Sequence, residues 1–504
     1  MDILTATLEL LVNPATLALI VLGVAGGTIL GALPGVGSIL GITMVLPLTF
    51  VLSTESSLGL LLGIYAGSVF GGSISAILIN TPGTPQSAIT LFDGYPMAQA
   101  GNGPLAIGWA AVASTVGGVI ATLIFLLAAP MLASVGLLFG PIEFFALGVF
   151  ALTCLAVVSK EHLAKGVVAA LIGLILATVG QDPMSGYARL TFDSFELAAG
   201  IGLLPLLVGL FALSEVFDRA SSVTARENAP AADRKDRMQL PKLGDIWRRR
   251  AVLIKSSVIG TGIGILPGIG AVAASTVSYA EAKRSSVNRA DFGSGEPDGV
   301  IASEASNNAV TSGAMIPTLS LGIPGDPITA IMLGALAIQG VTPGPQFFSN
   351  NAGLGFFIFA ALVLSCLLII PVAALVTPVF SRILRIPEPL LLTCIVVLIG
   401  AGTYSVNSSG FDLLVTLLAG IFGLIMRKNH YPLAPLVIGF VLGPLIERSL
   451  RQGLVLTEGS FVEFLSSPIA SGFFLVTALF LLFPLLGRVR WLARRRLKGA
   501  ESNP

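Results

Sequence analysis

Long apolar stretches without charged residues dominate the hydrophobic pattern of this chain, and short polar segments that contain proline and glycine interrupt them. A helix needs about 20 apolar residues to cross a bilayer. Four uncharged runs come close to that length or exceed it: Pro104–Ala129, Leu197–Ser214, Gly353–Val379 and Ser466–Leu486. The pattern predicts an all-α polytopic membrane protein with roughly 11–14 membrane segments, some of them broken or re-entrant.

The interruptions occur twice, at matching places. The segment from Gly27 to Gly37 matches the segment from Gly260 to Gly270, 233 residues later, at seven of eleven positions. Proline lacks an N–H and glycine tolerates positive φ, so a Pro-Gly pair ends or breaks a helix. The predicted helix breaks are Pro34, Gly35, Gly37, Pro267, Gly268 and Gly270.

A second pair of elements follows each of these breaks by about fifty residues. Asn80-Thr-Pro-Gly-Thr-Pro85 corresponds to Gly322-Ile-Pro-Gly-Asp-Pro327 in one register. Matching breaks in two halves of an apolar chain indicate the binding site of a secondary transporter. Whether Ala15–Leu52 crosses the membrane twice or dips back as a hairpin is left open by the sequence.

The distribution of basic residues predicts the orientation of these repeats. The first 159 residues contain no Lys or Arg, whereas Glu215–Arg250 contains nine and Arg488–Lys498 contains six. Short basic loops stay in the cytoplasm. Counting spans from these loops places Leu91–Gly103 inside and Ile338–Asn351 outside, so the two repeats are predicted to have inverted topology.

The expected organisation is therefore a first repeat at 14–215 and an inverted repeat at 251–395, joined by a charged cytoplasmic linker at 216–250. C-terminal helices at 396–487 and a basic cytoplasmic tail at 488–504 follow, and Trp491 with its basic neighbours is expected to contact membrane lipid.

Composition agrees with a membrane protein, since 54% of the residues are hydrophobic and only 11% are charged. The N-terminus lacks the pattern of a signal peptide, so we expect the first apolar segment to be retained. Glycines at a spacing of four, such as Gly23, Gly27 and Gly31, fit close helix packing as well as a functional role. The three cysteines have neither disulfide nor metal-ligand spacing.

Half-helices that start at a break offer free N–H groups with partial positive charge, which bind carboxylates without a cationic side chain. The first repeat has no cation to offer before Lys160, so such groups and neutral donors would have to hold an anion there. The candidate substrate-binding residues are Asn80, Thr81, Pro82, Gly83, Thr84, Gly322, Ile323, Pro324, Gly325, Asn307 and Asn308.

Two acidic residues are candidates for coupling to an ion, because a carboxylate inside a membrane is costly and indicates an ion or proton pathway. Asp326 is the first candidate, because it stands where the first Pro-Gly-x-Pro element has Thr84. Glu304 is the second candidate. The alternatives are an N-cap or Asx turn for Asp326 and a solvated interfacial side chain for Glu304. The coupling ion would be Na⁺ or H⁺; no cofactor and no metal site other than Na⁺ are expected.

Enzymatic motifs of metalloproteases, serine hydrolases and nucleotide-binding loops do not occur in the sequence, so we expect no enzyme and no ATP hydrolysis. A gated anion channel is the alternative class. Channels usually have a continuous polar pore lining, whereas the polar positions here are clustered at the breaks.

Several separated motifs resemble one family. Gly31-Ala-Leu-Pro-Gly-Val-Gly37, Asn80-Thr-Pro-Gly-Thr-Pro85, Phe92-Asp-Gly-Tyr-Pro-Met-Ala98, Ser303-Glu-Ala-Ser-Asn-Asn308 and Gly322-Ile-Pro-Gly325 resemble the large membrane subunit of tripartite tricarboxylate transporters, the TctA family. The resemblance runs from about residue 15 to about residue 445.

The resemblance implies a bacterial inner-membrane permease that works with a small four-helix (TctB-like) membrane subunit and a periplasmic substrate-binding (TctC-like) protein. It implies ion-driven transport of citrate-like carboxylates and no nucleic-acid partner. A carboxylate permease that needs no binding protein remains a further alternative.

Overall fold

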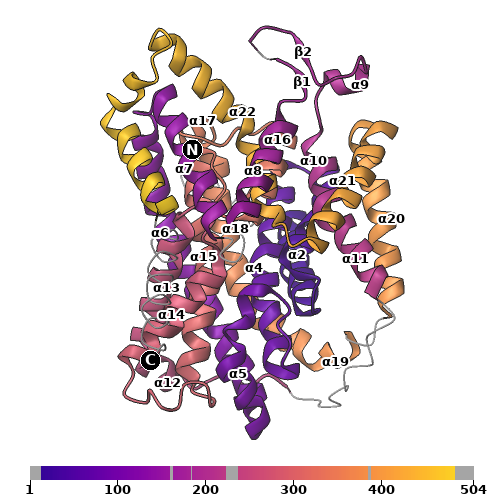
Figure 1. Ribbon diagram of the computed structural model, residues 1–504. Coiled ribbons are helices and arrows are strands. Elements are labelled where there is room, and N and C mark those ends of the chain that lie inside the picture. Colours follow the sequence, from indigo (N-terminus) through magenta and orange to yellow (C-terminus); the bar gives the residue numbers. More distant parts are fainter. Residues whose placement is uncertain (1–12, 159–162, 183, 223–236, 384–386, 483–504) are drawn as a thin grey trace, which may run out of the picture. The chain divides into compact units, whose positions relative to one another are not determined.

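The computed structural model describes residues 13–158, 163–182, 184–222, 237–383 and 387–482, and it confirms an all-α polytopic membrane protein (Figure 1). Within these residues, seven helices are long and apolar enough to cross a membrane, and shorter apolar helices accompany them. The seven are Pro14–Ala32, Thr54–Ile79, Leu91–Gly136, Ala352–Val379, Pro389–Asn407, Gly410–Lys428 and Leu433–Leu456.

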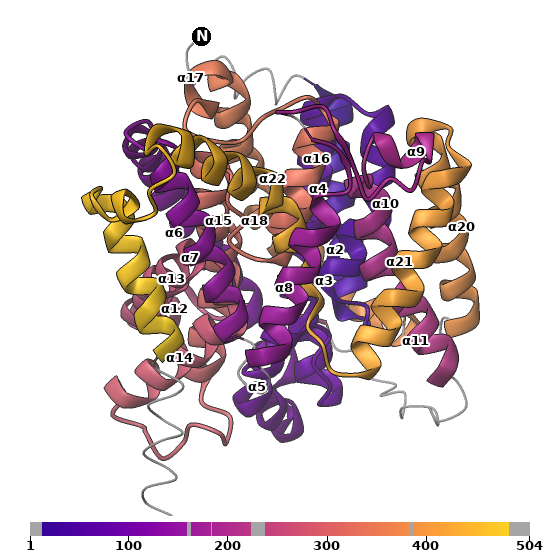
Figure 2. The ribbon, with the colours of Figure 1, turned by 45° about the horizontal axis from the view of Figure 1, so that its top comes forward.

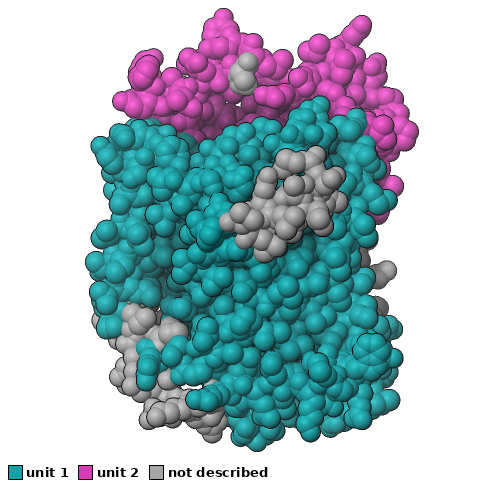
Figure 3. Space-filling view, turned by 180° about the vertical axis from the view of Figure 1, so that it is seen from behind, with its two compact units in different colours: residues 1–137, 202–425 teal, residues 138–201, 426–504 magenta. Residues whose placement is uncertain are grey.

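The chain forms two compact units, which Figure 3 colours separately. Unit 1 contains Met1–Leu137 and Gly202–Ile425, and unit 2 contains Leu138–Ile201 and Met426–Pro504. These units are defined by packing, whereas the predicted repeats are defined by sequence symmetry, so the repeat boundaries remain a prediction. Residues 223–236 of the predicted linker and the whole basic tail at 488–504 lie outside the described residues.

Unit 1 holds most of the helices. They are α2 (Pro14–Ala32), α3 (Gly37–Val45), η1 (Leu46–Val51), α4 (Thr54–Ile79), η2 (Pro85–Ala88), α5 (Leu91–Met97), η3 (Ala98–Asn102), α6 (Gly103–Gly136), α10 (Leu203–Leu207), η4 (Val208–Leu213), α11 (Ser214–Ser222), α12 (Leu243–Arg248), α13 (Arg250–Ile265), α14 (Gly270–Ser285), α15 (Pro297–Leu321), α16 (Pro327–Ile338), α17 (Phe347–Asn350), α18 (Ala352–Val376), η6 (Thr377–Val379), α19 (Phe380–Ile383), α20 (Glu388–Asn407) and most of α21 (Gly410–Lys428).

Residues 14–51 form a helical hairpin, here called the first hairpin, in which α2 runs beside α4 and α3 returns (Figure 2). Both ends contact the start of α4. The Thr16 hydroxyl lies 3.0 Å from that of Ser56, and the Ser57 hydroxyl donates to the Thr49 carbonyl at 2.9 Å. The last turn of α2 packs on Ser68, well before α4 ends. Both ends of the segment therefore lie at the same end of α4.

Small residues allow α2 and α4 to run in contact along their backbones. A Cβ added at Gly31 would lie 2.1 Å from the Ser68 carbonyl oxygen, and one added at Gly67 would lie 2.3 Å from that of Val24. Real Cβ atoms do not approach backbone oxygens so closely, so only glycine fits at these positions. The packing interpretation of the glycine spacing is therefore confirmed for α2.

Residues 250–285 form the second hairpin, from α13 and α14, and it packs against α15 in the same way. A Cβ at Gly260 would lie 2.4 Å from the Ser306 carbonyl oxygen. Lys255 near the start of α13 donates to Glu281 near the end of α14 at 3.1 Å, so the two ends of this hairpin also lie together.

The long helices α4 and α15 cross in antiparallel directions. Ser73 of α4 bonds Glu304, early in α15, whereas Tyr65, earlier in α4, bonds Asp326, beyond the end of α15. Increasing residue numbers in one helix therefore match decreasing numbers in the other. In Figure 1, α5 and α12 lie at one end of unit 1, and α16 and α17 lie at the opposite end.

Unit 2 contains the remaining described elements: α7 (Pro141–Val158), α8 (Leu163–Ala177), β1 (Gly180–Gln181), β2 (Ala188–Arg189), α9 (Phe195–Ala198), α22 (Leu433–Leu456), η7 (Val462–Leu465) and an apolar helix at Pro468–Leu482. The predicted span Leu197–Ser214 is wrong at its start. Ser194 caps the short helix α9, Gly200 adopts a φ of +85°, and the next helix begins only at Leu203.

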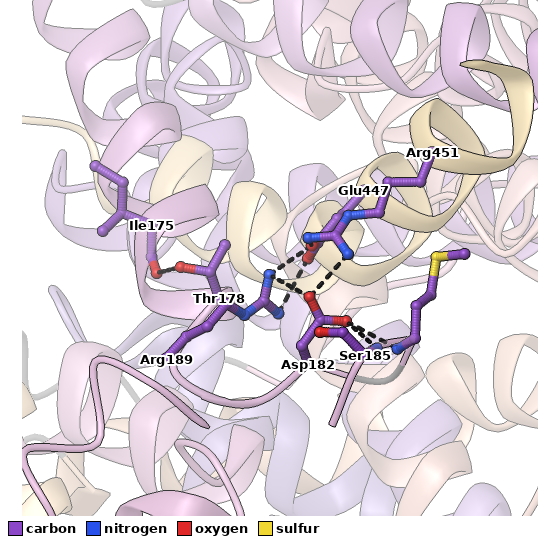
Figure 4. A network of polar contacts seen from close by, with 8 residues as sticks. Ile175, Thr178, Asp182, Ser185, Arg189, Glu447 and Arg451 are labelled. Atoms are coloured by element: carbon purple, nitrogen blue, oxygen red, sulfur yellow. Dashed lines mark hydrogen bonds and ion pairs between the residues drawn. The ribbon is translucent and has the colours of Figure 1, made fainter. Parts of the chain in front are cut away.

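Charged residues join the β1–β2 loop to α22 within unit 2 (Figure 4). Arg451 donates to Asp182 at 2.7 Å, and Arg189 donates to Glu447 at 2.5 Å. Asp182 also accepts the backbone N–H of Met184 at 2.8 Å. These bonds hold the base of the loop that follows α8.

Candidate functional site

The breaks at the two hairpin tips have the same backbone shape. Gly35 and Gly37 have φ values of +81° and +65°, and Gly268 and Gly270 have +83° and +74°. A residue with a Cβ is strained at such values. The structure thus places all six predicted break residues between the two limbs of a hairpin.

The long helices end at a second pair of matching breaks. α4 ends at Asn80 and α15 at Gly322, both in the left-handed conformation, with φ of 54° and 71°. Asparagine and glycine are the residues that adopt this conformation most readily. The two elements that aligned in the sequence therefore end their helices in the same way.

A new helical segment starts directly after each of these breaks. The Thr84 N–H donates to the Ser87 hydroxyl at 3.4 Å before η2, and the Asp326 N–H donates to the Thr329 hydroxyl at 2.9 Å before α16. At the longer helix, α16, Pro327 has no N–H and the Asp326 carboxylate accepts the N–H of Thr329, so a side chain of the protein itself caps the first turn.

Each hairpin tip meets the break of the adjacent long helix. The Gly268 N–H donates to the Gly325 carbonyl at 2.8 Å. In the first half, a Cβ added at Gly83 would lie 2.0 Å from the Gly31 carbonyl oxygen. Irregular backbone from two segments, far apart in the sequence, is thus brought together once in each half of unit 1.

The predicted substrate-binding residues divide by burial. Asn80 and Thr81 are exposed, and Pro82 and Gly322 are partly buried. The others are buried: Gly83, Thr84, Ile323, Pro324, Gly325, Asn307 and Asn308. The structure brings Gly83 and Gly325 to the two hairpins, whereas Asn80 and Thr81 are exposed.

Asp326 is buried and serves as the N-cap of α16. Its Oδ1 accepts the Thr329 N–H at 2.7 Å, and the Tyr65 hydroxyl of α4 donates to its Oδ2. The N-cap alternative for this residue is therefore confirmed. All of these bonds join elements of the fold, so Asp326 has a structural role whatever else it does.

Glu304 is fully buried in α15, so its interpretation as a solvated interfacial side chain is wrong. Three hydroxyl groups surround its carboxylate: Ser73 of α4 at 2.6 Å, Thr90 before α5, and Ser114 of α6 at 3.1 Å. Within the described part of the chain, no basic side chain forms an ion pair with it. The polar segment before α15 suggested an exposed start of the helix. In the structure, α4, α5 and α6 cover α15 from its first turns.

Asn307 and Asn308 lie one turn beyond Glu304 and are fully buried. The oxygen and the nitrogen of both side-chain amides make no hydrogen bond with any residue that the structure describes. Buried polar groups in native proteins are almost always paired, so such groups need an explanation by a ligand, an ion or water.

Sequence reasoning missed Arg219 of α11. Its guanidinium donates to the Pro34 carbonyl at 3.1 Å and to Glu215 at 2.8 Å, and it lies against Gly35 at the first hairpin tip. A positive charge is thus present at the first break, although the first repeat has no basic residue before Lys160. The position of Arg219 at the edge of a charged linker gave no signal that it folds back.

The hydroxyl groups around Glu304 were missed as well. Ser73 comes from α4, Thr90 from the turn before α5 and Ser114 from α6, and isolated Ser and Thr are common in apolar helices. No spacing in the sequence relates them.

Comparison with known proteins assigns the family. The sequence model of the tripartite tricarboxylate transporter TctA family matches residues 17–438. The chain belongs to this family. It is therefore a membrane component of a transporter, as the motifs indicated.

Two relatives come from Agrobacterium vitis. An uncharacterized 52.8 kDa protein in the TAR-I ttuC' 3' region is 38% identical over 482 residues, covering 96% of this chain and 95% of the relative. An uncharacterized protein in the TAR-II ttuC' 3' region is 37% identical over 228 residues, covering 45% of this chain and 94% of the relative. No solved structure matches the chain.

Proposed function

We propose that this chain is the permease subunit of a binding-protein-dependent tripartite transporter, which moves tricarboxylates or related carboxylates across the bacterial inner membrane and uses an ion gradient. The observation that carries the proposal is the pair of helical hairpins, each of which meets the break of a long helix. Discontinuous helices in two matching halves are the usual binding architecture of secondary transporters.

Inverted topology of the two halves belongs to the proposal. The antiparallel crossing of α4 and α15 supports it, and so do contacts at the two ends of unit 1. Asp93 accepts the N–H groups of Gly293 and Glu296, beside the linker predicted to be cytoplasmic. At the opposite end, Gln339 donates to the Thr49 carbonyl. Each repeat thus places the segment after its break beside the start of the other repeat's long helix.

Carboxylate recognition would use backbone N–H groups at the breaks. Helix N-termini carry partial positive charge, and this charge acts strongly in a low-dielectric interior. Arg219, which is ion-paired with Glu215, adds a guanidinium at the first hairpin tip. A substrate with several carboxylates suits two such anion sites better than one.

Coupling would use one of the two buried carboxylates. Asp326 is already engaged by Tyr65 and by the first turn of α16. Glu304 caps no helix and is held by hydroxyl groups alone. We therefore favour Glu304 as the coupling residue, which reverses the order that the sequence register suggested.

Reconstitution tests the proposal. The chain, its small membrane partner and the binding protein would be placed in proteoliposomes with labelled citrate outside and an inward Na⁺ or H⁺ gradient. We expect accumulation above the external concentration, which an ionophore for the driving ion abolishes and which requires the binding protein. Equilibration without accumulation would instead support the channel. Accumulation without the binding protein would support an independent permease.

A further inference from the structure

The two halves of unit 1 differ chemically at equivalent positions. The register of 242 residues that aligns the two Pro-Gly-x-Pro elements also pairs Tyr65 with Asn307 and Asp326 with Thr84. Tyr65 and Asp326 bond each other across the crossing of α4 and α15. Their counterparts do not, because the Asn307 side chain has no partner among the described residues. The polar side chains of Tyr65 and Asp326 thus satisfy each other, whereas the equivalent residues, Asn307 and Thr84, do not.

The same register places Glu304 where the other half has an apolar residue. Its counterpart is Leu62, and the counterparts of its hydroxyl partners Ser73 and Thr90 are both methionines, Met315 and Met332. All three counterparts are buried. A repeat needs only apolar packing at this depth, so the polar cluster is an addition to one half and not a requirement of the fold.

Glu304, Asn307 and Asn308 present their side chains within one face of α15, because residues three and four apart lie beside each other on a helix. Together they offer a carboxylate and two unpartnered amide oxygens, all fully buried. Burial without partners is costly for both amides, and burial without a counter-charge is costly for the carboxylate. Oxygen ligands of this kind suit hard cations.

We propose that Glu304, Asn307 and Asn308 bind a sodium ion, and that this site exists in one half of the protein only. A single carboxylate balances one positive charge, whereas a divalent ion would leave a net charge in the apolar interior. Among the described residues, no group of three or more His, Cys, Asp or Glu side chains could hold such an ion. A proton would neutralise Glu304 but would leave both amides unpaired.

The sodium site specifies the coupling ion of the proposed function. Its role in transport rests on that function. Binding itself is measured without transport. Purified protein in detergent would be heated in NaCl, KCl or choline chloride at equal ionic strength, and ²²Na⁺ binding would be measured in parallel. We expect NaCl alone to raise the melting temperature, and unlabelled Na⁺, but not K⁺, to displace the label.

Asn307→Ala, Asn308→Ala and Glu304→Gln should each weaken Na⁺ binding by about tenfold or more, the factor that corresponds to losing one good ligand interaction. Tyr65→Phe is the matched control. It sits at the equivalent depth in α4 and loses a hydrogen bond, so its melting temperature falls, but its NaCl-dependent shift should stay.

Absence of a Na⁺-specific shift and of ²²Na⁺ binding in the unaltered protein would overturn the site, and this result needs no variant to fold. Unchanged Na⁺ affinity in all three variants would overturn the ligand assignment. Uptake driven by a proton gradient without Na⁺ binding would reject the sodium site while leaving ion-driven transport intact. Passive equilibration with intact Na⁺ binding would reject the proposed function and leave the site.

Discussion

At the scale of residues, Asp326 and Glu304 are two buried carboxylates of unit 1 whose different environments give them different roles. Asp326 lies inside a repeated motif, yet its bonds to Tyr65 and Thr329 give it a structural task. Glu304 lies outside the repeated motifs, and its bonds leave a carboxylate without a counter-charge among the described residues. Their neighbours in space, rather than in sequence, separate the two roles.

Asp326→Asn tests this separation. Asparagine caps helices about as well as aspartate, so the cap of α16 should persist, while the hydrogen bond from Tyr65 weakens because the charge is gone. We expect the variant to lose on the order of 1 kcal/mol of stability and to keep gradient-driven uptake. Thermal unfolding and proteoliposome uptake would be measured together. Loss of gradient dependence at an unchanged melting temperature would make Asp326 the coupling residue after all.

The sequence predicted the helix-ending residues well, because proline and glycine act through their own backbone chemistry. It could not predict Arg219 at the first break or the hydroxyl groups around Glu304. Those contacts join segments that are far apart in the chain, for example Thr90 and Glu304, and they follow no period. Charge and spacing alone therefore placed Glu304 at an interface rather than in the interior.

At the scale of elements, the hairpins depend on backbone contact rather than on side-chain interlocking. The sequence left open how deeply residues 15–52 enter the membrane, since an apolar stretch has no mark for depth. Packing shows its path within the protein: α2 runs parallel to α4 from Thr16 to Gly31 and then turns. Gly83 and Gly325 are also packed against protein, on Gly31 and Ala314. A valine introduced at either position would disturb this packing. Loss of transport in such a variant would therefore not show that the glycine contacts the ligand.

Gly31→Ala should therefore destabilise unit 1 strongly, because its Cβ would lie 2.1 Å from a backbone oxygen and force α2 away from α4. We expect a loss of about 2 kcal/mol or more, in the range of overpacked cores. Gly26→Ala is the matched control on the same helix, since its Cβ would meet nothing within 4 Å. Melting temperatures in detergent would compare the two variants. Equal stability of both would mean that α2 and α4 are not in close contact.

The loop of unit 2 gives a prediction about pH. The backbone N–H of Met184, followed by Arg451, holds the pKa of Asp182 well below its usual range. A lowered pKa in the folded state stabilises the protein above the unfolded value of about 4. That contribution is lost as the pH falls through the folded pKa.

Asp182→Asn should accordingly lower the melting temperature at pH 7. Its deficit relative to the unaltered protein should begin to shrink as the pH drops below about 4. Because all other titrating groups are shared, the difference between the two melting temperatures at each pH reports on Asp182 alone. A deficit that stays constant down to the lowest pH at which both proteins remain folded would show that the charge of Asp182 contributes nothing.

At the scale of the whole molecule, two separate signals bear on the predicted topology. The basic residues of the sequence predict which loops are cytoplasmic, and the contacts of unit 1 group the same loops. Gln239, in the linker, donates to the Pro104 carbonyl next to the loop predicted to be inside. Gln339, near the start of the loop predicted to be outside, contacts the start of α4 instead. An inverted repeat requires these two groups to lie on opposite sides of the membrane.

Single cysteines at Asn102 and Ser349 test that requirement, because both positions are exposed. The background would lack the native cysteines, of which Cys154 and Cys366 are buried and Cys394 is exposed. In intact cells, a membrane-impermeant maleimide should label Ser349→Cys at once and Asn102→Cys only after the membrane is opened. A permeant maleimide, which should label both, controls for reactivity. Labelling of both cysteines from outside would place the two loops on one side, and the two halves could then not be related by inversion.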